Sequence, residues 1–278
     1  MRLLAVSGPV FRTLEFARLD AHTRGQLEPW TNEYSTRMGK RFEALISTLI
    51  EENVSAGHWE PEYEYERGAK SPDFILFEAS GTVVLVQAKL KRMTPGAFFG
   101  YDLDAFKSDA DRFAETLWRS IRYLRNIKRM RQRGRPLDQV SERVLASTRV
   151  VLVGIMPFLS PVFVPGLPRD VIKAAVRKQL KEEEDPLFDF NSVAGWHIMG
   201  FDDLSVFFSL RSKGTLGQAI VDYVSDMGDI FIDDRGFVPS FRNWCIRRYG
   251  PGSDPPASWK RAYDLIWAHG KRLLFHSE

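Results

Sequence analysis

The sequence predicts an α/β fold, with helices covering a layered sheet, followed by a mainly helical C-terminal part. The segments 82–90 and 149–157 begin as apolar runs on both faces, as expected of strands that are buried on both sides of a sheet. A long segment with helical periodicity lies between these two strands, and another precedes the first strands. The expected order is therefore helix, three strands, helix and strand.

The first helix is expected over residues 31–53, because its apolar positions follow helical spacing. A first strand is expected over residues 58–66, where Glu alternates with other side chains and Pro61 favours the edge of a sheet. Because an edge strand has one solvated face, we interpret Glu62 and Glu64 as solvated edge charges rather than ligands.

The next two strands are expected to form a hairpin over residues 73–77 and 82–90, with the turn at Ser80 and Gly81. Successive strand residues point to opposite faces of a sheet. Gln87 and Lys89 therefore share the face of Val83 and Leu85, and this face turns polar where the strand ends.

A long helix is expected over residues 103–132, followed by the strand at 149–157. Beyond it, a short strand near residues 196–199 is expected to extend the sheet. Helices are expected at 169–183, 202–210, 216–227, 239–248 and 258–275. The expected organisation is an N-terminal segment (1–30), a core (31–160) and a mainly helical C-terminal subdomain (161–278).

Composition limits the class of protein. The chain has 278 residues, 44% of them hydrophobic, which is enough for one large domain or for a core with a smaller partner. Its net charge of +3 permits a nucleic-acid partner without requiring one. Cys245 is the single cysteine, so no internal disulfide can form and a zinc site of Cys and His is disfavoured.

No apolar run suits a signal peptide or a membrane span, so we expect a cytoplasmic protein without a membrane partner.

The hairpin carries the residues that suggest chemistry. Mg²⁺ prefers oxygen ligands and keeps several of its waters, so a carboxylate and one or two carbonyl oxygens can hold it. Asp73 offers the carboxylate, Gln87 an amide oxygen and Ala88 its backbone carbonyl. Lys89 is placed to orient a water or to stabilise charge on a phosphate.

This pattern resembles the PD-(D/E)xK phosphodiesterase superfamily, through Pro72-Asp73 and the Gln87-Ala88-Lys89 segment of the next strand. The resemblance covers residues 31–160 and implies a restriction-endonuclease-like αβββαβ core around a central mixed sheet. It implies a metal-dependent endonuclease that uses Mg²⁺ or Mn²⁺ to hydrolyse DNA, in restriction, defence against foreign DNA or DNA repair. Glu43 resembles the helix-borne Glu of the family, a second-shell or water-mediated ligand.

Gln87 departs from the acidic residue that most members of the superfamily carry. A Gln at this place is similar to the variant in Mrr-like restriction endonucleases. It removes one negative charge, so cation binding is expected to be weaker than with a second carboxylate but not abolished.

Other interpretations remain open. Asp73 after Ser71 and Pro72 has the composition of a turn, and Gln87 and Lys89 could mark a strand end that reaches solvent. The fold could also serve a catalytically inactive nucleic-acid-binding or scaffold module, or a nuclease for RNA. Because many enzymes that cut duplex DNA pair two sites, a homodimer is compatible with the resemblance. The chain has no phosphate-binding P-loop sequence, so an ATPase in the same system would be a separate chain.

A basic run without acids extends from Arg119 to Arg135. Arg122, Arg125 and Arg129 share one helix face and could follow a phosphate backbone, together with Lys91 and Arg92 after the hairpin. The alternative is a solvated helix C-terminus, where cations complement the helix dipole. Trp196, Trp244 and Trp259 could stack on bases, but we interpret them as core residues.

Overall fold

The structure is a computed structural model that describes residues 39–40, 42–52, 57–89, 103–156, 174–176, 178, 193–200, 203–230 and 241–250. The chain forms two compact units, residues 1–52 with 255–278, and residues 53–254. In the first unit, residues 42–51 are helical and bury Phe42, Ile46, Leu49 and Ile50. This burial confirms the helical spacing predicted for this stretch. The N-terminal segment 1–30 and the helix expected at 258–275 lie outside the described residues.

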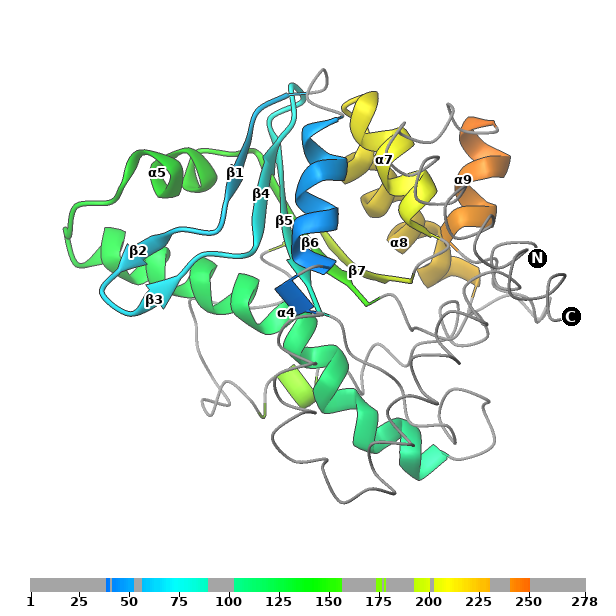
Figure 1. The fold of residues 1–278 in the computed structure, drawn as a ribbon, viewed down its shortest axis with the longest axis horizontal. Coiled ribbons are helices and arrows are strands. Elements are labelled where there is room, and N and C mark those ends of the chain that lie inside the picture. The colour runs from blue at the N-terminus through cyan, green and yellow to red at the C-terminus, as the bar shows by residue number, and fades with distance from the viewer. Residues whose placement is uncertain are drawn as a thin grey trace, which may run out of the picture. The chain divides into compact units, whose positions relative to one another are not determined.

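The second unit is built on a five-stranded sheet with the order β1-β4-β5-β6-β7 (Figure 1). Its strands are β1 (Trp59–Pro61), β4 (Phe74–Phe77), β5 (Thr82–Ala88), β6 (Arg149–Ile155) and β7 (Gly195–Met199). The pairs β1–β4 and β4–β5 are antiparallel, whereas the pairs β5–β6 and β6–β7 are parallel. The sheet is therefore mixed, as expected, and β7 extends it.

The hairpin of β4 and β5 forms the centre of the sheet. All residues of both strands are buried, which explains why both faces of each strand are apolar. Gly81 in the connecting turn has a φ of 80°, a conformation that glycine adopts without steric cost. The hairpin and the following strand at 149–155 were both predicted from their apolar runs.

The prediction of one continuous strand over residues 58–66 is wrong, because this stretch forms two strands. The stretch consists of β1 and of β2 (Glu64–Glu66), and β2 pairs with β3 (Ala69–Lys70) in a separate two-stranded sheet. Pro61 ends β1, because proline cannot donate a ladder hydrogen bond. Glu62 and Tyr63 therefore form a connection between two sheets, rather than the middle of an edge strand.

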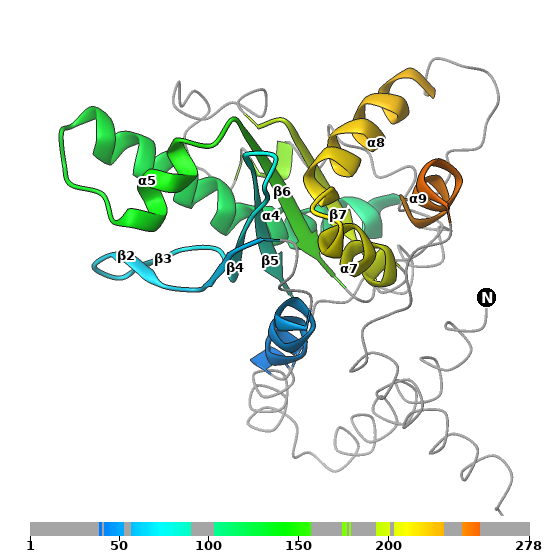
Figure 2. The same cartoon turned by 90° about the horizontal axis from the view of Figure 1, so that it is seen from above.

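Helices cover both faces of the five-stranded sheet. The helix α4 (Leu103–Gln132) packs Phe113, Leu117 and Ile121 into one core with Leu85 of β5. On the opposite face, a Cβ on Gly217 of α8 (Leu216–Ile230) would collide with the Thr82 side chain. Figures 1 and 2 show α4 and α8 on opposite sides of the strands. Because strand side chains alternate, Gln87 lies on the α4 face with Leu85.

A buried acid joins α8 to the hairpin. Glu78 accepts hydrogen bonds from the Gly217 N–H at 3.2 and 3.3 Å, near the N-terminus of α8, where a carboxylate complements the helix dipole. Burial raises the pKa of Glu78, and its electrostatic attraction to Arg211 opposes this. Arg211 is fully buried and donates to the Gly57 carbonyl at 3.0 Å, so these polar groups tie three segments of the second unit together.

The remaining helices of the second unit are α5 (Gln139–Leu145), α7 (Leu204–Ser212) and α9 (Phe241–Tyr249). The sequence did not predict α5, a short helix that Asp138 caps by accepting from the Ser141 N–H. α7 and α9 lie within two residues of their expected bounds, and residues 174–176 and 178 are helical within the helix expected at 169–183.

The stretch that we assigned to a C-terminal subdomain contributes directly to this unit. β7 is a strand of the central sheet, and α8 covers one of its faces. Trp196 and Trp244 are buried, as predicted for core residues, while Trp259 lies outside the described residues. Among the helices that the structure describes, none has the length and apolar character needed to cross a membrane.

Candidate active site

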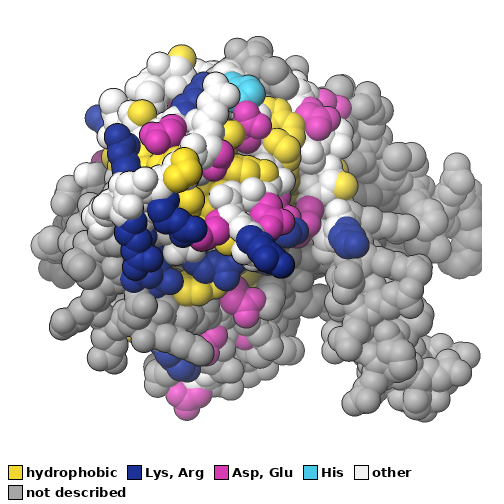
Figure 3. Space-filling model, turned by 90° about the vertical axis from the view of Figure 1, so that its left-hand side faces the viewer, with side chains coloured by type: hydrophobic (Ala, Val, Ile, Leu, Met, Phe, Trp, Pro, Cys, Tyr) yellow, Lys and Arg dark blue, Asp and Glu magenta, His cyan; other side chains and the backbone are white. Residues whose placement is uncertain are grey.

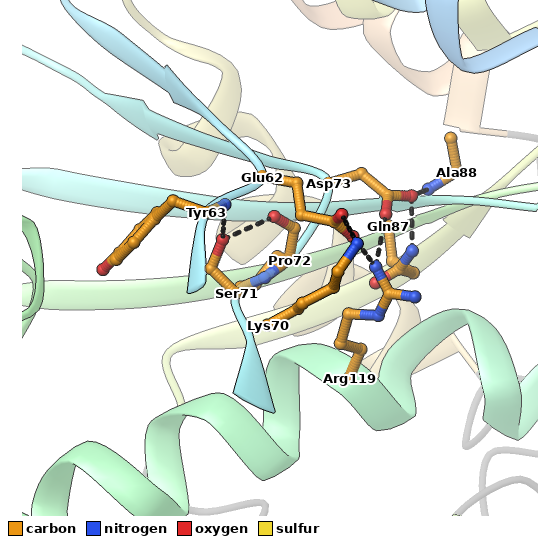
Figure 4. Close-up of polar contacts among 9 residues, drawn as sticks. All are labelled: Glu62, Tyr63, Lys70, Ser71, Pro72, Asp73, Gln87, Ala88 and Arg119. Atoms are coloured by element: carbon orange, nitrogen blue, oxygen red, sulfur yellow. Dashed lines mark hydrogen bonds and ion pairs between the residues drawn. The ribbon is translucent and has the colours of Figure 1, made fainter. Parts of the chain in front are cut away.

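Asp73 lies immediately before β4, on the face of the sheet that α4 covers. The register pairs Phe74 with Val86, so continuing it by one residue sets Asp73 opposite Gln87. The Asp73 Oδ2 atom accepts from the Gln87 side-chain amide and from the Ala88 N–H, the latter at 2.8 Å (Figure 4). The Asp73 carboxylate accepts hydrogen bonds from β5 and α4, so its role extends beyond a local turn.

Gln87 is fully buried, so the interpretation that it marks a strand end in solvent is wrong. Its amide nitrogen donates to Asp73, whereas its Oε1 atom has no hydrogen-bond partner among the described residues. Burying a polar atom without a partner costs about 1–3 kcal/mol of folding free energy. Such an atom therefore requires an explanation, and one explanation is a bound ion. The Ala88 carbonyl points to the same strand edge as the Ala88 N–H, since both groups of a strand residue face one neighbour.

Three residues that were not expected at the site from the sequence, Arg119, Glu62 and Lys70, form a network with Asp73. The Arg119 side chain reaches from α4 and donates to the Asp73 Oδ1 atom at 3.0 Å. The same nitrogen, Nη1, donates to the Glu62 Oε2 atom. Lys70 donates to the other oxygen of Glu62 at 2.6 Å. The interpretation of Glu62 as a solvated edge charge is therefore wrong, because it lies in a network with Asp73 (Figure 4).

The break between β1 and β2 explains the position of Glu62. The connection that carries it is held beside the start of β4 by two hydrogen bonds with Ser71. The Ser71 N–H donates to the Tyr63 carbonyl at 2.9 Å, and the Tyr63 N–H donates to the Ser71 hydroxyl at 3.0 Å. Because Ser71 is two residues before Asp73, these bonds hold Glu62 near the Asp73 carboxylate.

A group of buried and partly buried hydroxyls anchors the other side of the same connection. The Tyr63 hydroxyl lies 2.8 Å from that of Tyr123 and donates to Asp138 at 3.1 Å. Burial raises the pKa of Tyr63 to about 12 and also raises the pKa of Tyr123. Both phenols therefore stay protonated at neutral pH, and they fix the connection to α4 and α5 as hydrogen-bonding groups.

The other two predicted catalytic residues are Lys89 and Glu43, and their positions relative to Asp73 are less closely defined. The Lys89 N–H donates to the Ile155 carbonyl at 2.9 Å, so the pairing of β5 continues one residue past its end. Alternation along the strand then sets the partly exposed Lys89 on the face of Gln87. Glu43 lies on the helix of the first unit, whereas Asp73 belongs to the second unit. The placement of Glu43 beside Asp73 stays a prediction.

The predicted phosphate-binding residues differ in exposure. Arg122 and Arg129 on α4 are partly exposed, while Arg125 is only 9% exposed and has the least surface to offer. Burial also lowers the pKa of the neighbouring Lys128. Figure 3 shows the face that lies on the left in Figure 1. Lys and Arg side chains gather on this face, with acidic side chains among them. Lys91 and Arg92 lie outside the described residues.

The donors at this corner fit a hard divalent cation. Among the described residues, no group of three His, Cys, Asp and Glu side chains could hold a metal ion. The corner offers a different set, which comprises the Asp73 carboxylate, the Ala88 carbonyl and the Gln87 Oε1 atom, which has no hydrogen-bond partner in the described part of the chain. All three donors are oxygens, which Mg²⁺ prefers, and Mg²⁺ needs few protein ligands because it retains waters.

Known proteins give no direct guide to this site. Comparison of the chain with protein-family models, with curated proteins and with solved structures finds no match.

Proposed function

We propose that the protein is a metal-dependent nuclease of the restriction-endonuclease-like fold that hydrolyses phosphodiester bonds in DNA. The observation that carries the proposal is the pairing of Asp73 with Gln87 at the end of the hairpin, where the buried Gln87 amide oxygen has no hydrogen-bond partner among the described residues. The mixed sheet with a helix between its parallel strands β5 and β6 supports the same fold. The resemblance of Pro72-Asp73 and Gln87-Ala88-Lys89 to the superfamily supports the reaction.

Asp73, Gln87 and the Ala88 carbonyl would hold Mg²⁺ or Mn²⁺. When bound, the ion would neutralise charge on the scissile phosphate and help to activate water. Lys89 would stabilise the charge that develops on the phosphate, because a fixed cation acts most strongly in a site that partly excludes water. The buried face of the sheet holds Asp73 and Gln87 in place, so the site is preorganised.

The choice of DNA rests on the resemblance, and the basic residues support a nucleic-acid substrate in general. A DNA backbone suits the basic residues of α4, among which Arg122 and Arg129 retain exposed surface. Restriction, defence against foreign DNA and DNA repair are the settings that the resemblance implies, and a separate ATPase or a second copy of the chain would be compatible partners.

A second candidate is a non-catalytic nucleic-acid-binding or scaffold module. One observation favours it, since Arg119 already neutralises Asp73 without any metal ion. In such a module the ion pair would be structural, and the Asp73 corner would have no reason to bind a divalent cation.

An assay with purified protein distinguishes a DNA nuclease from an RNA nuclease and from a non-catalytic module. Linear duplex, supercoiled and single-stranded DNA and a structured RNA are each incubated with Mg²⁺, with Mn²⁺ or with a chelator. We expect metal-dependent cleavage of DNA. Cleavage of RNA alone would change the substrate class, and binding without cleavage under every condition would support the scaffold module.

A further inference from the structure

Arg119 holds two carboxylates with one nitrogen. Its Nη1 atom donates to Asp73 Oδ1 at 3.0 Å and also to Glu62 Oε2. Oxygens of both acids therefore converge on a single positive group. A divalent cation bound by oxygen ligands at 2.0–2.6 Å makes the same demand on its surroundings.

The charges of this group are balanced without a metal ion. Glu62 and Asp73 carry two negative charges, and Arg119 and Lys70 carry two positive ones. Their burial is graded, because the side chains of Asp73, Arg119 and Glu62 are 7%, 26% and 30% exposed. Asp73 is thus the buried member of the group, whereas Arg119 and Glu62 are both partly exposed to solvent.

An ion pair alone does not account for Gln87. The Gln87 side chain is fully buried and donates to the Oδ2 atom of Asp73, while its Oε1 atom is without a partner among the described residues. Arg119 satisfies Asp73 but not this oxygen. A cation beside Asp73 would satisfy both, which makes the orphan oxygen an observation independent of the two acids.

We infer that Glu62 is the second carboxylate of the divalent-cation site and that Arg119 is an internal counter-cation, which leaves its position when the ion binds. The inference rests on the proposed metal site and extends it. Glu62 then supplies the negative charge that Gln87 lacks. Arg119 keeps Asp73 and Glu62 from repelling each other while no ion is bound, and its long, partly exposed side chain allows it to move aside.

The test is a titration of the full, metal-free chain with Mn²⁺ in the absence of DNA. Binding is measured as the loss of the free-ion signal in electron paramagnetic resonance. Glu62→Gln is expected to weaken Mn²⁺ binding by about tenfold or more, since metal ligands and their partners have effects of this size. Arg119→Met is expected to strengthen binding, because it removes the competing cation. Arg119→Lys keeps the charge and should bind closer to wild type. Glu64→Gln, an exposed residue of β2, is the matched control and should leave binding unchanged.

The variants separate failure of this inference from failure of the metal site. If Asp73→Asn abolishes Mn²⁺ binding but Glu62→Gln binds as wild type does, the role of Glu62 is overturned and the metal site stands. If Arg119→Met, or Arg119→Gln should the former not fold, binds more weakly than wild type, the role of Arg119 as a competitor is overturned. If the wild-type protein binds no Mn²⁺, both the metal site and this inference fail.

Discussion

Arg119, in the middle of α4, donates to Asp73 at the start of β4 over a distance of 3.0 Å, although 46 positions separate them in the chain. This ion pair connects the helix layer to the end of the hairpin. It places a cation beside the one carboxylate that is most buried in the site. The properties of the site without metal therefore depend on a residue that the hairpin sequence does not contain.

Arg119→Met should lower the free energy of unfolding of the metal-free protein by about 1–3 kcal/mol. The physical reason is that Asp73 keeps its buried charge and loses its cation. Urea denaturation at neutral pH measures the change. Arg131→Met is the control, since Arg131 is exposed and its contact with Glu142 is 4.0 Å long, and it should change stability by less than about 0.5 kcal/mol. Equal losses in both variants would show that the ion pair contributes nothing specific.

Gln87→Glu should strengthen Mg²⁺ binding and destabilise the protein without metal. The new carboxylate would add a ligand charge, but without an ion it would face Asp73, to which Gln87 now donates a hydrogen bond. Melting temperatures with a chelator and with Mg²⁺ test both effects. The gain on adding Mg²⁺ should exceed that of wild type and of the control Gln139→Glu, at an exposed position of α5. A smaller gain than in wild type would argue against an ion at Gln87.

Lys89→Ala should reduce DNA cleavage by about 100-fold or more while leaving DNA binding nearly unchanged, because a single charge that stabilises developing charge has effects of this order. Single-turnover cleavage and a binding titration in a chelator give the two values. Lys213→Ala, at an exposed position after α7, controls for loss of a positive charge. Unchanged cleavage in the Lys89 variant would remove Lys89 from the mechanism.

Replacing Arg122 and Arg129 by Gln should reduce the salt dependence of DNA binding. Each phosphate contact contributes about 0.9 to the slope of log K against log salt concentration, so loss of two contacts should lower its magnitude by about 2. Binding titrations at several salt concentrations measure the slope. Arg125 is a poorer candidate, since it is buried. An unchanged slope would favour the alternative that this helix face is only solvated.

Much of the fold could be predicted because local patterns determine it. The apolar runs of β5 and β6 and the periodicity of α4 depend on neighbouring residues, and the ends of α4 agree with the prediction. The break after Pro61 was missed because the alternating Glu residues continue across it. Pro61 ends the pairing, and hydrogen bonds of Tyr63 with Ser71, eight residues further along the chain, then hold the connection beside the start of β4.

The site was predicted in part for the same reason. Asp73 and Gln87 face each other because the register of a hairpin follows from its turn, and this can be read from the chain. Arg119 could not be assigned from the basic run alone, although one signal was present. It lies three residues after Thr116 and four before Tyr123, both of them buried, and therefore on the sheet-facing side of α4. A basic residue on an otherwise buried helix face indicates an acidic partner in the layer beneath it.

The most direct test of the central claim is the nicking of supercoiled DNA in Mg²⁺ by wild type, Asp73→Asn and Asp104→Asn, compared under single-turnover conditions. Asp104 is exposed in the first turn of α4, about 22 Å along the helix from Arg119, and serves as the matched control. We predict cleavage by wild type and Asp104→Asn, its loss in Asp73→Asn and its suppression by a chelator. Cleavage by Asp73→Asn at the wild-type rate would contradict the assignment of the active site to the Asp73–Gln87 corner.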